Sequence, residues 1–108
     1  MDTGIYHRVG AADEFEPAQL RAATVEGREV VVGRTREGLW FALDNTCTHA
    51  YARLCEGRLR GNRLMCPLHG ASFDVRDGSV LGAPAPTGLV AHAVRVVGGQ
   101  VEVALSGS

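Results

Sequence analysis

The chain has 108 residues, with 12 acidic and 11 basic side chains and a net charge of −1. This length fits a single domain over residues 1–108. The near-neutral charge argues against a nucleic-acid-binding protein, and the 45% apolar content argues against a disordered chain. No apolar run is long enough to span a membrane, and the N-terminus lacks the features of a signal peptide. We therefore expect a cytoplasmic monomer that binds neither nucleic acid nor membrane.

The first part of the chain has the pattern of short strands separated by turns. Glycine in Glu26-Gly27-Arg28 and in Arg36-Glu37-Gly38 favours tight turns, because glycine adopts positive φ angles easily. A further turn is predicted at residues 13–17. The strands predicted around these turns cover residues 5–9, 19–25, 30–32 and 39–43.

After residue 43 the strand pattern lapses twice, over residues 44–54 and 66–70. The strands predicted in this part cover residues 57–59, 63–65, 72–75, 89–97 and 101–105. A loop with two prolines is predicted at residues 82–86, since proline fixes φ and has no donor. No segment shows a helical period. Regular strand spacing therefore predicts an all-β protein, either a sandwich or a small barrel.

Two short motifs fall in the two irregular segments. The first is Cys47-Thr48-His49 and the second is Cys66-Pro67-Leu68-His69-Gly70, with sixteen residues between His49 and Cys66. Thiolates and imidazoles bind zinc and iron–sulfur clusters. Common zinc fingers keep like ligands together, whereas each segment here offers one sulfur and one nitrogen. Two such loops suit a two-iron cluster with thiolates on one iron and imidazoles on the other.

With these motifs the sequence resembles the Rieske ferredoxin family. The resemblance continues through Ser72-Phe73-Asp74, Gly78 and the proline loop, and covers roughly residues 3–105. It implies the Rieske fold, an antiparallel β-sandwich or barrel with a small cluster-binding subdomain at about residues 45–76, formed by two loops. It implies a Rieske-type 2Fe–2S cofactor and no catalytic residues. The implied metal ligands are Cys47, His49, Cys66 and His69.

The resemblance also implies a function in electron transport within aromatic hydrocarbon catabolism. Such a ferredoxin takes one electron from an NAD(P)H-dependent flavin reductase and passes it to a terminal aromatic-ring-hydroxylating dioxygenase. The protein itself is then not an enzyme, because only His7 and His92 remain for the mononuclear iron site of an oxygenase. The alternatives are a Rieske-like small subunit of a reductase, such as nitrite reductase, and a structural zinc module.

The same resemblance bears on the redox potential. High-potential members have an extra cysteine in each loop, at the positions of Ala52 and Leu68, and hydroxyl residues at the positions of Ala71 and Phe73. Hydroxyl donors to the cluster sulfurs stabilise the reduced state. Their absence implies a midpoint potential of roughly −150 mV, at the low end of the Rieske range.

The net charge conceals an uneven distribution. Residues 1–44 carry a net charge of −3 and residues 45–76 a net charge of +3. The cationic segment is either a solvated surface or a docking surface for acidic partners. Exchanging Arg53 or Arg58 for Gln would distinguish the two interpretations. Cys55 lies outside both motifs and is interpreted as a packing cysteine, while Tyr51 has no assigned role.

His92 lies on a predicted strand with Val90, Val94 and Val96 at a period of two. Its side chain is therefore expected to be partly buried and to have a structural role.

Overall fold

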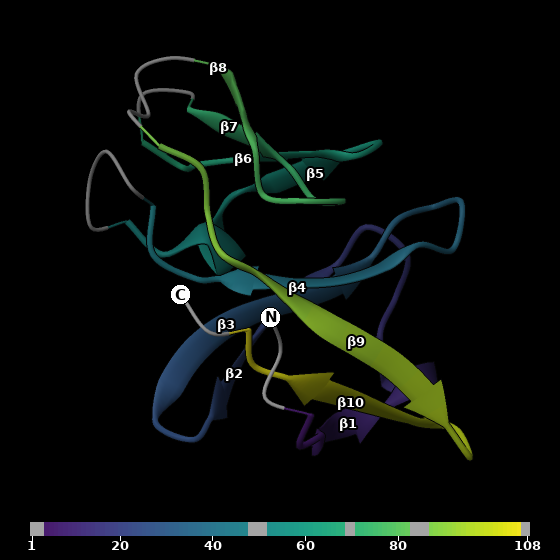
Figure 1. Cartoon of the computed structure of the whole chain (residues 1–108). Helices are drawn as coiled ribbons and strands as arrows, with labels where there is room; N and C mark the ends of the chain where they lie inside the picture. Colours follow the sequence, from purple (N-terminus) through teal and green to yellow (C-terminus); the bar gives the residue numbers. More distant parts are fainter. Residues whose placement is uncertain (1–3, 48–51, 69–70, 83–86, 107–108) are drawn as a thin grey trace.

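The computed structural model describes residues 4–47, 52–68, 71–82 and 87–106. These residues form two antiparallel sheets and two short 3₁₀ turns (Figure 1). The all-β prediction is thereby confirmed. No helix in the described ranges is long and apolar enough to cross a membrane.

The larger sheet has six strands in the order β1-β10-β9-β4-β3-β2. Its first and last strands, β1 and β2, contact each other, so the sheet is nearly closed. The strands are β1 His7–Ala11, β2 Leu20–Val25, β3 Arg28–Arg34, β4 Trp40–Asp44, β9 Ala91–Val97 and β10 Gln100–Ala104. The turn predicted at Gly27 joins β2 to β3, and a turn at Gly98-Gly99 joins β9 to β10. All three glycines have positive φ angles.

The smaller sheet has four strands in the order β5-β6-β7-β8 and lies above β4 in Figure 1. Its strands are β5 Arg58–Arg60, β6 Arg63–Met65, β7 Ser72–Asp74 and β8 Val80–Gly82. The 3₁₀ turn η2, Leu54–Glu56, leads into β5. Each irregular segment predicted from the sequence enters or leaves this sheet, so the small sheet connects the two candidate ligand loops.

Two features differ from the sequence expectations. Strand β8 was not predicted, because Val80 and Leu81 are both partly exposed and show no apolar alternation. The segment predicted as a turn at 13–17 begins with the 3₁₀ turn η1, Ala12–Glu14, and then buries Phe15 almost completely. Phe15 packs edge-on against Trp40, with 5.3 Å between the ring centroids.

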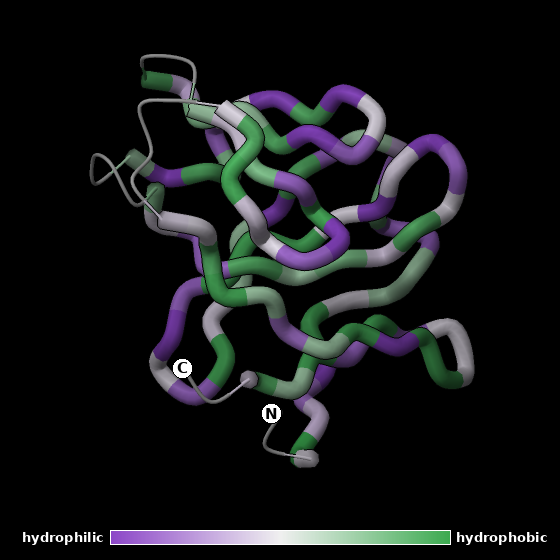
Figure 2. The backbone as a smooth tube through the Cα atoms, turned by 45° about the horizontal axis from the view of Figure 1, so that its top comes forward, coloured by the Kyte–Doolittle hydropathy of each residue, from purple (hydrophilic) through white to green (hydrophobic). Residues whose placement is uncertain are grey.

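The core has two parts, and β3 contributes to both because its side chains alternate between faces. Val30 and Val32 point into the larger sheet with Phe15, Val101 and Val103. Val31 points the other way, into a cluster between the two sheets. Three consecutive valines of β3 are therefore buried, and Figure 2 shows hydrophobic and hydrophilic residues interspersed along the backbone of the whole chain. The cluster between the sheets also contains Cys47 and Cys66, which places the candidate metal centre against the core.

Candidate metal centre

The first loop begins directly after β4. Thr46 pairs with Arg53 in an isolated β-bridge, and the backbone N–H of Cys47 donates to the carbonyl of Ala52 at 2.9 Å. These contacts hold the two ends of the loop together. Cys47 therefore stands at the base of a closed loop and not on a free segment of chain.

The second loop begins directly after β6 and is closed in the same way. The backbone N–H of Cys66 donates to the carbonyl of Ala71 at 2.7 Å, again across five residues. In addition, the backbone N–H of Leu68 donates to the sulfur of Cys66 at 3.5 Å. Each cysteine is thus the first residue of a loop that is closed by a backbone hydrogen bond to the residue five positions later.

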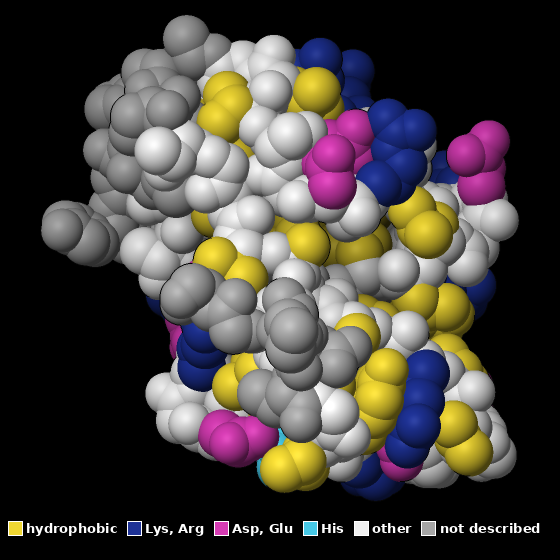
Figure 3. All heavy atoms as spheres, viewed as in Figure 1, with side chains coloured by type: hydrophobic (Ala, Val, Ile, Leu, Met, Phe, Trp, Pro, Cys, Tyr) yellow, Lys and Arg dark blue, Asp and Glu magenta, His cyan; other side chains and the backbone are white. Residues whose placement is uncertain are grey.

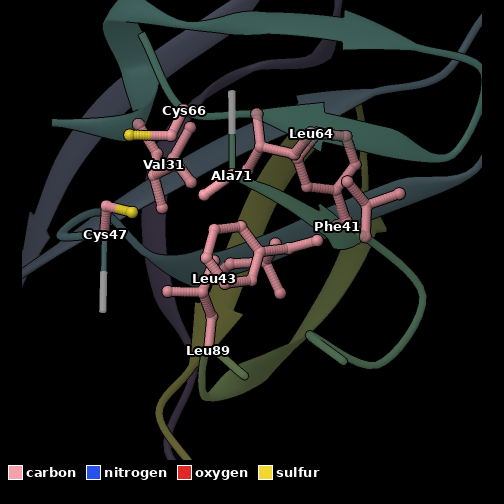
Figure 4. Close-up of a cluster of buried hydrophobic side chains, with 11 residues drawn as sticks. Val31, Phe41, Leu43, Cys47, Leu64, Cys66, Ala71 and Leu89 are labelled. Atoms are coloured by element: carbon pink, nitrogen blue, oxygen red, sulfur yellow. The ribbon is translucent and has the colours of Figure 1, made fainter. Parts of the chain in front are cut away.

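The two thiols are buried side by side. Cys47 is 3% exposed and Cys66 is 5% exposed, and Figure 4 shows their sulfurs pointing toward the same space between the sheets. Burial, together with the neighbouring Cys47 thiol, raises the pKa of Cys66 above its ordinary value. Two converging thiols in a buried site fit the sulfur ligands of one iron in a 2Fe–2S cluster. Metal binding here would displace their protons.

The two predicted imidazole ligands, His49 and His69, lie outside the described residues, as does Tyr51. Within the described ranges no group of three or more His, Cys, Asp or Glu side chains is placed to hold a metal ion. The structure therefore brings Cys47 and Cys66 together, and the four-ligand set remains a proposal.

The side chain of Asn45 stabilises the base of the first loop. The sequence alone did not indicate this role. Its side chain is fully buried and donates to the carboxylate of Glu29 at 2.8 Å and to the sulfur of Cys55 at 3.4 Å. Arg53 also donates to Glu29, at 3.1 and 3.2 Å. The hydrogen bonds from Arg53 and Asn45 lower the pKa of Glu29. Cys55 thus packs beneath the loop, in agreement with its interpretation as a packing cysteine.

A second polar network lies one residue earlier, at Asp44. Arg28 binds its carboxylate with two hydrogen bonds of 2.8 and 2.9 Å, and His92 Nε2 donates to it at 2.8 Å. His92 Nδ1 accepts the backbone N–H of Ser106 at 3.0 Å, which leaves the ring proton on Nε2. Burial alone would raise the pKa of Asp44, but the hydrogen bonds from Arg28 and His92 outweigh it and lower this pKa.

The structural role predicted for His92 fits these contacts, and the side chain is buried completely, more than was expected. Asp44 and Asn45 could not be recognised from spacing, because their partners are distant in the sequence. The only sequence signal was their place between a predicted strand and the first motif.

Two antiparallel sheets carrying a pair of matched loops define a small β protein in which two buried cysteines lie side by side. Comparison with known proteins identifies its kind. The Rieske 2Fe–2S domain matches residues 6–98, and the chain belongs to this family. Its cofactor is accordingly a Rieske-type 2Fe–2S cluster.

Named relatives cover nearly the whole chain. The ferredoxin component of the naphthalene 1,2-dioxygenase system of Pseudomonas aeruginosa is 38% identical over 86% of this chain and 88% of its own length. The ferredoxin of carbazole 1,9a-dioxygenase from Nocardioides aromaticivorans is 33% identical, with a TM-score of 0.89 over 95% of this chain and 100% of its own.

A second solved structure contains a partner protein. It is the complex of reduced oxygenase and oxidised ferredoxin in carbazole 1,9a-dioxygenase, and one of its chains is 33% identical to this one. The TM-score is 0.88 over 96% of this chain and 98% of that chain.

Proposed function

We propose that this protein is the ferredoxin component of a multicomponent dioxygenase, an electron carrier and not an enzyme. The observation that carries the proposal is the pair of buried thiols, Cys47 and Cys66, held by two matched loops at one end of the small sheet. The relatives whose sequences align with most of this chain are ferredoxin components of dioxygenase systems. A single domain of 108 residues, with a cluster-binding subdomain at about 45–76, is consistent with a carrier.

The proposed ligands are Cys47 and Cys66 on one iron and His49 and His69 on the other. When bound, the cluster takes up and releases one electron. The chain's own contribution is to exclude water from the thiolates, to aim them through the two loop closures, and to donate the Leu68 backbone N–H to the Cys66 sulfur. That donor stabilises negative charge on the sulfur.

The proposed partners are a flavin reductase that uses NAD(P)H and a terminal oxygenase that hydroxylates aromatic rings. The solved oxygenase–ferredoxin complex supports the oxygenase as one partner, and the multicomponent systems of the relatives support the reductase. A cytoplasmic monomer suits a carrier that visits two partners in turn. Leu68 is 47% exposed, directly after Pro67 and two residues from Cys66. This apolar tip is available for contact with either partner.

The test measures electron flow through the purified, cluster-loaded protein. The naphthalene dioxygenase reductase with NADH supplies electrons, and cytochrome c accepts them. We expect cytochrome c reduction to depend on added protein and to be lost in Cys47→Ser, whereas the matched control Cys55→Ser keeps its cluster and its activity. A wild-type protein that holds its cluster but does not increase this rate would contradict the proposal.

A further inference from the structure

The outer face of the small sheet carries three arginines. Arg58 and Arg60 alternate with Leu59 on β5, and Arg63 precedes the buried Leu64 on β6. Successive side chains of a strand point to opposite faces, so all three arginines point away from the core. All three are exposed. At the upper right of Figure 3, where Figure 1 places this sheet, arginine side chains lie beside acidic ones. We call Arg58, Arg60 and Arg63 the arginine face.

These arginines differ from their neighbours in their pairing: the cross-strand partner of Arg63 on β7 is Asp74, but the carboxylate of Asp74 binds Arg76. Within the described ranges no carboxylate forms an ion pair with any of them, and Arg63 instead donates to the Ser72 hydroxyl at 2.6 Å. The other two arginines of the cationic segment are paired, Arg53 with Glu29 and Glu56 and Arg76 with Asp74. The excess charge of the segment is therefore concentrated on the arginine face.

The arrangement also places like charges directly opposite each other. Arg60 and Arg63 are cross-strand partners in the β5–β6 hairpin. Like charges in this position repel and destabilise the pairing. A surface of this kind favours association with negative charge supplied from outside the chain.

The arginine face borders the metal centre. Arg58 is the cross-strand partner of Met65, the residue immediately before Cys66. Strand residues are spaced by about 3.3 Å, so Arg63 lies roughly 10 Å from Cys66 along β6, and Arg60 lies beside Arg63 on the neighbouring strand. A protein that covers the exposed tip at Leu68 can therefore reach the arginine face as well.

We propose that the arginine face docks a carboxylate-rich surface on the protein that exchanges electrons with this one. The inference rests on the proposed carrier function and adds the surface chemistry of the partner. Arginine suits this task because its planar fork binds carboxylates with two parallel hydrogen bonds. Its unpaired charge also accelerates encounter with an acidic partner. Arg53, which the sequence suggested as a docking residue, is excluded because Glu29 and Glu56 already bind it.

The experiment compares two haem proteins of opposite surface charge as electron acceptors, acidic cytochrome b5 and basic cytochrome c. Stopped-flow mixing with the reduced, cluster-loaded protein gives second-order rate constants at low and high ionic strength. The test variant is Arg58→Gln/Arg60→Gln. The control is Arg8→Gln/Arg95→Gln, which removes the same charge from exposed positions on the larger sheet.

For the wild type we expect the rate with cytochrome b5 to fall as salt is added. At low salt, the rate constant of the test variant with cytochrome b5 should be about fivefold lower than that of the wild type, and it should depend little on salt. Its rate constant with cytochrome c should change little. The control should keep most of the wild-type rate. Equal losses in both variants would show a general charge effect and overturn the inference, as would an unchanged rate in the test variant. A wild-type protein that reduces neither acceptor would instead contradict the carrier function itself.

Discussion

Asn45 and Cys55 are joined by two hydrogen bonds across ten residues of chain. Asn45 Oδ1 accepts the backbone N–H of Cys55 at 2.8 Å, and Asn45 Nδ2 donates to the Cys55 sulfur at 3.4 Å. The first ligand loop lies between these two residues. The amide of a single buried side chain therefore holds the two sides of this loop together beneath Cys47.

Replacing Asn45 with alanine should open the base of the first loop. The substitution leaves the Cys55 N–H without its partner and removes one hydrogen bond to Glu29, which together predict a loss of about 1–3 kcal/mol in the free energy of unfolding. Chemical denaturation of the metal-free protein measures this. Asn62→Ala, in the β5–β6 turn, is the control and should change the free energy far less. Similar losses in the two variants would contradict the role assigned to Asn45.

Gly78 should tolerate alanine much less well than Gly27. Both have nearly the same positive φ, +82° and +80°, so both substitutions introduce the same backbone strain. A β-carbon at Gly78 would lie 2.1 Å from the carbonyl oxygen of Leu89, whereas nothing lies within 4 Å of one at Gly27. Denaturant midpoints should therefore fall clearly further for Gly78→Ala. Equal shifts would mean that the approach of Leu89 to the β7–β8 turn is not rigid.

Acid should weaken the fold through Asp44. Its pKa is lower in the folded protein than in the unfolded chain, so its ionised form stabilises the fold above about pH 4, and this contribution is lost as the pH falls through the folded pKa. Asp44→Asn should be less stable than wild type at pH 7, with a difference that shrinks below about pH 4. Asp13→Asn, at an exposed position, is the control. A constant difference between Asp44→Asn and wild type from pH 7 to pH 3 would rule out this linkage.

The positions of most strands could be predicted from the sequence, because glycine turns and apolar alternation are local signals. Strand β8 could not, since Val80 and Leu81 owe their strand conformation to pairing with β7 and not to any pattern of their own. Phe15 was likewise assigned to a turn, and only the packing of Trp40 from β4 shows that it belongs to the core.

The candidate site divides in the same way. Cys47 and Cys66 could be recognised because ligand chemistry needs particular residue types at short spacing. The contacts of Arg53 and Asn45 with Glu29 could not, because each joins residues 16 or more positions apart. The pattern of charge along the chain therefore indicated a cationic segment, but only the folded pairing shows which arginines remain unpaired.

Hydroxyl groups introduced beside the second loop should raise the midpoint potential. Ala71 and Phe73 are both fully buried in the cluster that contains Cys66. Donors at these positions would stabilise the reduced state, so Ala71→Ser/Phe73→Tyr should shift the potential upward by about 60 mV, equivalent to tenfold in a one-electron equilibrium. Redox titration measures the shift. Ala104→Ser, buried on β10, is the control, and a comparable shift there would contradict a local effect.

The potential and spectrum of the wild-type protein test the central claim most directly. Purified protein, titrated while its EPR spectrum is recorded, should be brown, contain two irons, and show a low-average-g signal on reduction with a midpoint near about −150 mV. Cys47→Ser and Cys66→Ser should lose this signal, whereas Cys55→Ser should keep it. A colourless protein that contains zinc, or a midpoint above about +100 mV, would contradict a low-potential Rieske electron carrier.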